Sequence, residues 1–263
     1  MATPAKSRSR STFGTRNQPE ASRDAILKAA ASEFANEGLS GARMDAIARS
    51  ARVNKALLYY YFRDKDALYG AVLDQFFRPL AQRLTQVLDS PAPAGQRILG
   101  YALAHFDTIA STPHYARLFQ SEMMSASRGM SPHLSRIVEE YSRPLSQRLI
   151  ATLTEGIDRR EFRPVDVTEF IPTLIATIVF YFVTAPMRQR LRGTDPFSPP
   201  AIQARRAAVL DQIAAMLFAD REAGLRLAAE FASNGGSAEI SPSPAPQPHH
   251  HVPARKRKLK RPE

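Results

Sequence analysis

The chain has 263 residues, of which 44% are hydrophobic and 23% charged, and it contains no cysteine and no tryptophan. A chain of this length has room for one large or two modest domains with hydrophobic cores. The absence of cysteine excludes disulfide bonds, thiolate metal ligands and a cysteine nucleophile. With 36 basic and 25 acidic residues, the net charge of +11 favours a polyanionic partner, nucleic acid or anionic lipid, without indicating a fold.

The excess positive charge is concentrated at the two ends of the chain. Residues 1–19 carry a net charge of +4 and residues 234–263 another +4, whereas residues 20–80 carry +1 and residues 81–233 carry +2. The first segment is rich in Ser, Thr and Arg and the last is rich in Pro, so neither has enough large apolar side chains to offset the entropy of ordering. We therefore predict a disordered basic arm at the start and a disordered, Pro-rich basic tail at the end.

Short patterns in the tail and elsewhere bear on metals, targeting and membranes. His249–His251 would suit a metal ion, but a solvated tract is favoured, and no metal or cofactor is predicted. Arg255–Arg261 resembles a nuclear-localisation or nucleic-acid patch, or else serves as a solubilising tail. Residues 1–30 lack the apolar core of a signal peptide, and Leu174–Val183 is too short to span a membrane. A cytoplasmic protein is expected.

Between residues 20 and 233, apolar side chains recur at intervals of three and four, and no run alternates with period two. This periodicity predicts an all-α fold with about nine helices. Gly38, Pro113 and Pro186 predict helix ends, and Pro144 predicts a kink or an irregular start. In chain order, the apolar stripes are Ile26, Ala30, Phe34; Leu68, Val72, Phe76, Leu80; Leu99, Leu103, Phe106, Ile109; Ile137, Tyr141, Leu145, Leu149, Leu153; Phe170, Leu174, Ile178, Phe182; and Val209, Ile213, Leu217.

The stretch from Met44 to Leu68 contains two short predicted helices separated by a tight turn. Ile47 and Ala48 lie on the first, which has fewer than two turns. Asn54, a favourable N-cap residue, follows the turn and begins a helix that contains three consecutive tyrosines. Two short helices joined in this way match the helix-turn-helix, whose second helix enters the major groove of DNA.

This stretch resembles the signature of the TetR family of bacterial transcriptional regulators. The resemblance is strong over about residues 20–80 and weaker beyond, where it depends on helical periodicity and on the segment 155–163. It implies a three-helix DNA-binding domain over residues 20–80 and a larger helical effector-binding and dimerisation domain over residues 81–233. The residues that match the signature are Ile47, Ala48, Ala51, Val53, Leu58, Tyr59, Phe62, Lys65 and Leu68.

Three places depart from the family pattern. Arg52 replaces the glycine of the turn, so a residue with a β-carbon is expected in or near a left-handed conformation, at about 1–2 kcal/mol. Asn54 replaces a serine and is an equivalent cap. The usual threonine before the first short helix is replaced around Ala42, Arg43 and Met44, where Arg43 can supply a phosphate contact of its own.

By resemblance, the start of the second helix faces the base edges. Lys55 can donate to guanine there, and Ala56 can meet a thymine methyl or simply leave room. The first two tyrosines are expected at sugar, base methyl or phosphate, and the third, like Lys65, at phosphate, unless one tyrosine packs inside. The residues expected at the DNA are Arg43, Met44, Asn54, Lys55, Ala56, Tyr59, Tyr60, Tyr61 and Lys65.

The resemblance also implies a homodimer, because each helix-turn-helix reads one half-site and dimers read two half-sites about one helical turn, or a multiple, apart. The family's four-helix interface corresponds here to residues 166–190 and 201–218, although these helices can also serve only to close the core of one subunit. Small side chains that would permit close helix approach are Ala207, Ala208, Ala214 and Ala215.

The family further places a small-molecule pocket inside its larger domain. Each residue proposed for it here is also compatible with an ordinary core or surface position. The candidates are Tyr101, His105, Glu122, Tyr141, Thr177 and Tyr181, with an apolar lining of Phe106, Phe119, Met123 and Met124. Pro79 lies in the helix that joins pocket and DNA-binding unit, where it predicts either a kink or a break between two helices.

The sequence therefore predicts a sequence-specific, DNA-binding transcriptional regulator. The leading hypothesis is a homodimeric repressor, nucleoid-associated when bound, that a small-molecule ligand releases from a palindromic double-stranded operator. The alternatives are an activator or a regulator without an effector, and a nonspecific architectural protein driven by its tails. An enzyme is not expected, because the sequence offers no Gly-rich phosphate loop, no clustered metal ligands outside the tail and no catalytic Ser–His–carboxylate spacing.

Overall fold

The computed structural model describes residues 19–112, 114–126 and 129–233, and these residues form helices joined by short connections. The predicted all-α class is confirmed. The helices outnumber the nine expected, because short ones such as α7 and α10 contain too few turns to show a clear stripe. The helices are α1 (Pro19–Gly41), α2 (Met44–Ser50), α3 (Lys55–Tyr61), α4 (Lys65–Leu88), α5 (Ala94–Ser111), α6 (Tyr115–Ala126), α7 (Pro132–Ile137), the π-turn η1 (Val138–Ser142), α8 (Arg143–Asp158), α9 (Val167–Val183), α10 (Ala185–Arg192), α11 (Pro199–Leu217) and α12 (Arg221–Ser233).

The predicted C-terminal tail, with His249–His251 and Arg255–Arg261, lies outside the described residues, as does the predicted N-terminal arm apart from its last residue.

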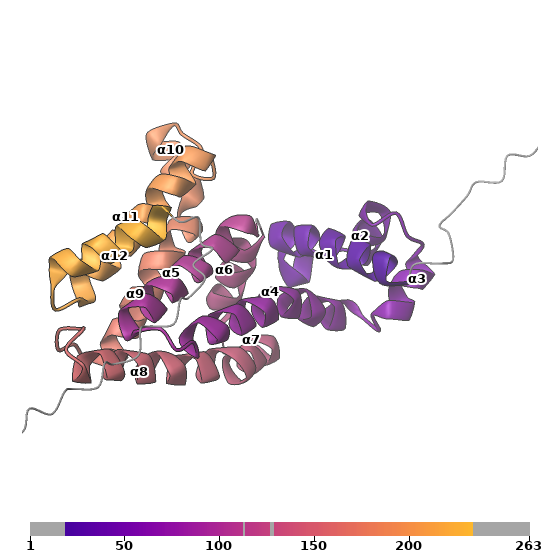
Figure 1. The fold of residues 1–263 in the computed structure, drawn as a ribbon. Helices are drawn as coiled ribbons and strands as arrows, with labels where there is room; N and C mark the ends of the chain where they lie inside the picture. The colour runs from indigo at the N-terminus through magenta and orange to yellow at the C-terminus, as the bar shows by residue number, and fades with distance from the viewer. Residues whose placement is uncertain (1–18, 113, 127–128, 234–263) are drawn as a thin grey trace, which may run out of the picture.

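Helices α1 to α3 and the first half of α4 form a small domain at one end of the molecule (Figure 1). The stripe predicted for the first helix is buried there, because Ile26 and Phe34 pack in its hydrophobic cluster. Gly38 interrupts α1 at the predicted position with φ 68° and ψ 176°, a positive-φ conformation that favours glycine but differs from the left-handed helical cap that the sequence predicts. Leu118 of α6 and Ile137 of α7 join the same cluster. The small domain is therefore packed against the larger one.

Helix α4 connects the two domains. Near its start, Leu68 and Val72 belong to the hydrophobic cluster of the small domain, whereas Leu80 and Leu84 belong to that of the larger domain. The helix continues through Pro79, so the predicted break between two helices is not observed. The predicted domain boundary after residue 80 falls inside this helix. Any movement of the second half of α4 therefore acts on the small domain through a continuous helix.

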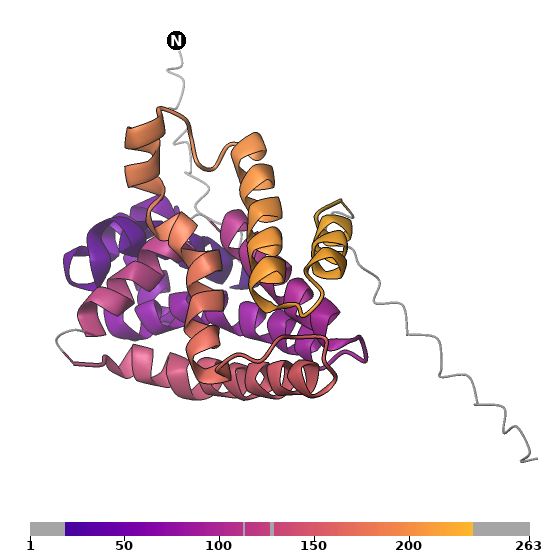
Figure 2. The ribbon, with the colours of Figure 1, turned by 90° about the vertical axis from the view of Figure 1, so that its left-hand side faces the viewer.

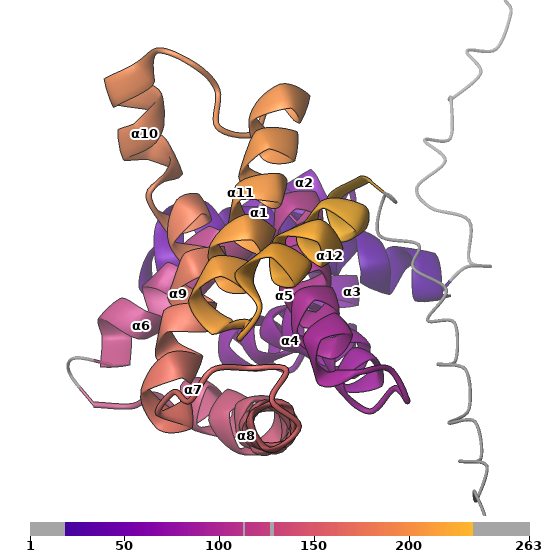
Figure 3. The ribbon, with the colours of Figure 1, turned by 60° about the vertical axis from the view of Figure 1, so that its left-hand side comes forward.

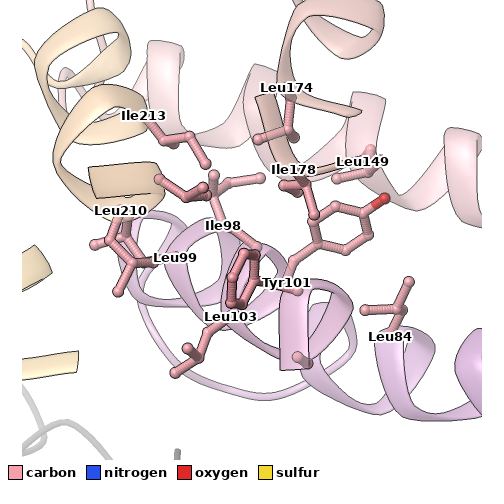
Figure 4. Close-up of a cluster of buried hydrophobic side chains, with 14 of the residues drawn as sticks. Leu84, Ile98, Leu99, Tyr101, Leu103, Leu149, Leu174, Ile178, Leu210 and Ile213 are labelled. Atoms are coloured by element: carbon pink, nitrogen blue, oxygen red, sulfur yellow. The ribbon is translucent and has the colours of Figure 1, made fainter. Parts of the chain in front are cut away.

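The larger domain is built around α5, which packs against α4, α8, α9, α11 and α12. Figure 4 shows Ile98, Leu99 and Leu103 of α5 among side chains from the helices around it. Leu174 of α9 and Ile213 of α11 are fully buried in the same cluster. Helices α9 and α11 lie side by side, and α12 folds back against α11 (Figures 2 and 3).

Helices α7 and α8 form one rod interrupted by the π-turn η1. Helix α8 begins at Arg143 and carries Pro144 in its first turn. Proline has no N–H to donate to the carbonyl four residues before it, and the wider π-turn accommodates this loss. The irregular start predicted at Pro144 is confirmed. It places Tyr141 beside α4, where its hydroxyl donates to Asp74 Oδ1 at 3.0 Å.

Within the described ranges, no single helix is both long and apolar enough to cross a membrane. Helices α9 and α10 together meet that test of length and composition, but only as a pair bent by 60°.

Candidate nucleic-acid interface

Helices α2 and α3 are joined by a turn that the sequence specifies closely. Val53 N–H donates to the Ala48 carbonyl at 3.0 Å, which closes α2. Arg52 lies in the left-handed region at φ 56°, as its place in the family's glycine position predicts. Asn54 then caps α3, because its Oδ1 accepts from the Leu57 N–H at 2.6 Å. The turn therefore sets the angle between the two helices.

The inner sides of both helices are anchored in the core of the small domain. Ile47 and Ala48 of α2 and Leu58 of α3 are buried in its hydrophobic cluster. Met44 is also buried there, so the structure places this predicted DNA contact in the core. Arg43, which was also expected at the DNA, precedes α2 and is exposed.

The outer side of α3 is exposed, basic and aromatic. Lys55, Ala56 and Tyr59 are exposed, and Tyr60 is 80% exposed. Tyr61 is half-buried, with its ring packed against those of Tyr60 and Phe62. The structure therefore brings four of the predicted contacts together on one surface, and one of the three tyrosines packs partly inside. This surface lies at the end of the molecule away from α12 (Figure 1).

Lys55 has a partner that the sequence analysis did not identify. Its Nζ lies 2.8 Å from Oδ1 of Asp45 on α2, and both side chains are about half exposed. The hydrogen bond between them holds the pKa of Asp45 below its ordinary value and raises the pKa of Lys55. Lys55 Nζ also lies 6.0 Å from the centre of the Tyr59 ring. No sequence spacing rule joins these residues, because the turn decides which side chains of α2 and α3 meet.

Lys65 has a structural role that the sequence did not predict. Its Nζ donates to the carbonyls of Ser40 and Ala42 at 3.0 and 3.1 Å, at the connection between α1 and α2. An ammonium is well placed where a helix leaves its last carbonyls without partners. Its neighbour Asp64 caps α4 by accepting from Ala67 N–H at 2.7 Å. Lys65 therefore holds the small domain together at the position where a phosphate contact is expected.

The larger domain contains a cavity of about 360 Å³ bounded by α4, α5, α6, η1, α8 and α9. Of the predicted pocket residues, Tyr101, His105, Phe119 and Tyr141 line it. The other predicted pocket residues lie elsewhere: Phe106 packs against Phe182 in the core, Glu122 is buried beside α4, Met123 and Met124 are exposed, Thr177 donates to the Thr173 carbonyl, and Tyr181 donates to the Pro196 carbonyl. A helical stripe indicates burial, but it does not distinguish core from cavity wall.

Two hydrogen-bond networks connect the wall of this cavity and its surroundings to α4. Tyr141, which lines the cavity, donates to Asp74 of α4, and Arg136 of α7 donates to the other oxygen of the same carboxylate at 2.9 Å. Nearby, the buried Tyr69 hydroxyl donates to Glu122 Oε1 at 2.6 Å, and burial is the main reason why the pKa of Tyr69 is raised. The larger domain therefore forms hydrogen bonds with α4 in the part of this helix that packs in the small domain.

The geometry of α2, the turn and α3, with Lys55 and two tyrosines exposed at one end of the molecule, is that of the helix-turn-helix of transcriptional regulators. Residues 26–72 match the family described as "Bacterial regulatory proteins, tetR family", and residues 98–213 match "Tetracyclin repressor-like, C-terminal domain". The chain belongs to the TetR family, as the sequence resemblance predicts.

Individual relatives agree with this assignment. The chain is 31% identical over 188 residues to the HTH-type transcriptional repressor SCO4008 of Streptomyces coelicolor, a match that covers 67% of this chain and 89% of the relative. It is 28% identical over 187 residues to the HTH-type transcriptional regulator RutR of Escherichia coli, covering 69% and 84%. The ketosteroid transcriptional regulator KstR2 of Mycobacterium tuberculosis has a similar fold, with a TM-score of 0.58 at 24% identity, covering 76% of this chain and 95% of that one.

Proposed function

We propose that the protein is a homodimeric repressor that binds a palindromic operator in double-stranded DNA and leaves it when a small molecule fills the cavity. The observation that supports this most is the path of α4. The helix begins beside α3, and its second half forms a wall of the cavity through Leu80 and Leu84. A ligand that favours one position of this helix also favours one position of α3.

The proposed dimer face consists of the exposed sides of α9 and α11. Phe180 of α9 is 63% exposed, and Ala176 one turn before it is exposed as well. On α11, Ala208 is half-buried and Ala204 exposed, whereas Ala214 packs inside the subunit. Small residues beside a large apolar side chain favour close packing of two helix pairs. These exposed residues support the proposed four-helix interface.

The dimer is tested by sedimentation of the purified full chain. Phe180→Glu places a charge in the proposed interface and is expected to give a monomer that binds an inverted repeat weakly. Met130→Glu, at a similarly exposed apolar residue outside α9 and α11, is the matched control and is expected to remain dimeric. A Phe180→Glu variant that remains dimeric would place the interface elsewhere.

Regulation is tested by footprinting the protein on the DNA upstream of its own coding sequence, with and without a panel of metabolites. A protected inverted repeat that is lost with one metabolite supports the proposal. Transcription from the same promoter then separates repressor from activator. Equal affinity for this site and for competitor duplexes would instead support a nonspecific architectural protein.

The proposal contains no catalytic step and assigns the chain to the cytoplasm, where bacterial chromosomal DNA lies. Unchanged ligand recovered after prolonged incubation with the protein would agree with this, and a new product would contradict it.

A further inference from the structure

We infer that the cavity binds an uncharged, largely apolar molecule bearing a single hydrogen-bonding oxygen, and that His105 recognises this oxygen. The inference rests on the proposed function, because the proposed function makes the cavity an effector site. It specifies the chemical class of the effector and the residue that selects it.

The lining of the cavity carries no charged side chain among the residues described. Most of it is aliphatic or aromatic, as with Phe77, Leu80 and Ile175, and its polar groups are hydroxyls and one imidazole. The carboxylate of Asp74, which accepts from the Tyr141 hydroxyl, is already bonded to Arg136. An ionised ligand would lose its hydration without gaining an opposite charge, which is strongly unfavourable. The lining therefore disfavours carboxylates and phosphates.

His105 is the unusual group in this wall. It is 6% exposed, and neither Nδ1 nor Nε2 has a hydrogen-bond partner among the described residues. Burial lowers its pKa to about 4, so the ring is neutral at physiological pH, with one nitrogen as donor and the other as acceptor. Buried polar atoms are nearly always paired in proteins, and an unpaired one is unfavourable. A ligand oxygen at His105 would supply a partner to one of these two nitrogens.

The surroundings of His105 restrict what that partner is. Tyr101 lies edge-on to the imidazole, with ring centres 5.6 Å apart, and its hydroxyl points toward Leu149 (Figure 4). The imidazole is therefore held at a largely apolar wall. Among the other polar groups of the lining, the Tyr141 hydroxyl already donates to Asp74, whereas the two nitrogens of His105 are buried without partners among the described residues. A ketone or alcohol on a hydrocarbon frame brings one oxygen to His105, whereas a sugar or nucleobase would place several polar groups against mostly apolar side chains. The volume of about 360 Å³ suits a ligand of drug-like size.

The experiment uses three probes with the same ring system: 2-acetylnaphthalene, naphthalene and 2-naphthoate. Their affinities for the full-length protein are measured by calorimetry at pH 7 without DNA. The ketone is expected to bind about tenfold more tightly than the hydrocarbon, as for one added buried hydrogen bond, and the carboxylate is expected to bind most weakly.

Variants assign the effect to a residue. His105→Leu is expected to remove the ketone's advantage while leaving the affinity for naphthalene equal or higher. Ser146→Ala, in the same lining, is the control and is expected to keep it. Ile175→Trp fills the cavity and is expected to abolish binding of all three probes, which tests the location independently if His105→Leu fails to fold. Circular dichroism reports folding.

The inference is overturned if the carboxylate binds best, if no probe binds the folded wild-type protein, or if His105→Leu keeps the preference for the ketone. Its failure is separate from failure of the proposed function. Probes that bind as expected without changing operator affinity would uphold the ligand class and contradict ligand release. A charged metabolite that binds in the cavity and releases the operator would do the reverse.

Discussion

Lys55 of α3 and Asp45 of α2 form an ion pair across the helix-turn-helix, with Nζ and Oδ1 2.8 Å apart. The residue proposed to read a base is therefore held by a carboxylate before DNA arrives. Because both side chains are about half exposed, the pair contributes little to stability, and its importance lies in orientation and in the charge that DNA meets. The reading surface combines one positioned cation with exposed tyrosines.

Replacement of this cation is the first test of the reading surface. Lys55→Ala should weaken operator binding by about 1–3 kcal/mol and relax specificity at one base pair. Fluorescence anisotropy on the operator and on single-base variants measures both effects. Arg159→Ala, which removes one exposed positive charge at the end of α8, is the control. An equal loss on operator and random DNA would contradict a base-reading role for Lys55.

Removal of the partner should have the opposite sign. Asp45→Asn keeps the shape of the side chain but removes a negative charge from the surface proposed to face the DNA. We expect tighter binding to both operator and random DNA, with a steeper dependence on salt, because the freed Lys55 can contact phosphate. Titrations at several salt concentrations measure this. Weaker binding to the operator alone would show instead that Asp45 positions Lys55 for a base.

The hydrogen bonds of Glu122 stabilise the contact between the domains. Tyr69 donates to one carboxylate oxygen and Ser131 to the other at 2.8 Å. Glu122→Ala leaves the buried Tyr69 hydroxyl without this partner and should lower the free energy of unfolding by about 1–3 kcal/mol. Urea denaturation measures the change. Glu122→Gln, which keeps an acceptor for one hydroxyl, should recover part of the loss, and equal losses in both variants would contradict the account.

The turn residue Arg52 is strained, because its backbone lies in the left-handed region, where a β-carbon is crowded. Arg52→Gly should relieve about 1–2 kcal/mol of strain, partly offset by the greater freedom of glycine in the unfolded chain. The expected net gain in unfolding free energy is up to about 1 kcal/mol by urea denaturation. Arg52→Ala loses the same charge but keeps the β-carbon, so it should show no gain. A glycine variant no more stable than the alanine variant would argue against strain.

Burial of His105 makes stability depend on pH. Its pKa is about 4 in the folded chain, below the ordinary 6.5, so between these values the unfolded chain binds a proton that the folded chain does not. Stability should therefore fall as the pH falls through this window, by about 2 kcal/mol from pH 7 to pH 5 from this group. The pKa of His114 is also lowered by burial, so the measurement compares wild type with His105→Leu. Identical pH dependences would contradict the assignment.

The fold was largely predictable because helical periodicity and capping depend on residues that are close in the sequence. Asn54 caps its helix and Gly38 has a positive φ, as their residue types indicate. Features that depend on tertiary packing were not predictable. A stripe residue such as Phe106 faces a neighbouring ring while His105 beside it faces a cavity, and Lys65 meets carbonyls more than twenty residues away. The partner of Lys55 depends on the angle of the turn.

In the proposed complex, two copies of α3 read an inverted repeat. Selection of bound duplexes from a random-sequence pool with the full-length protein, followed by sequencing, tests this. One palindrome should be enriched, with half-sites about one helical turn, or a multiple, apart, and Lys55→Ala should abolish the base preference at one position of each half-site. A bound pool with no enriched motif would contradict the claim.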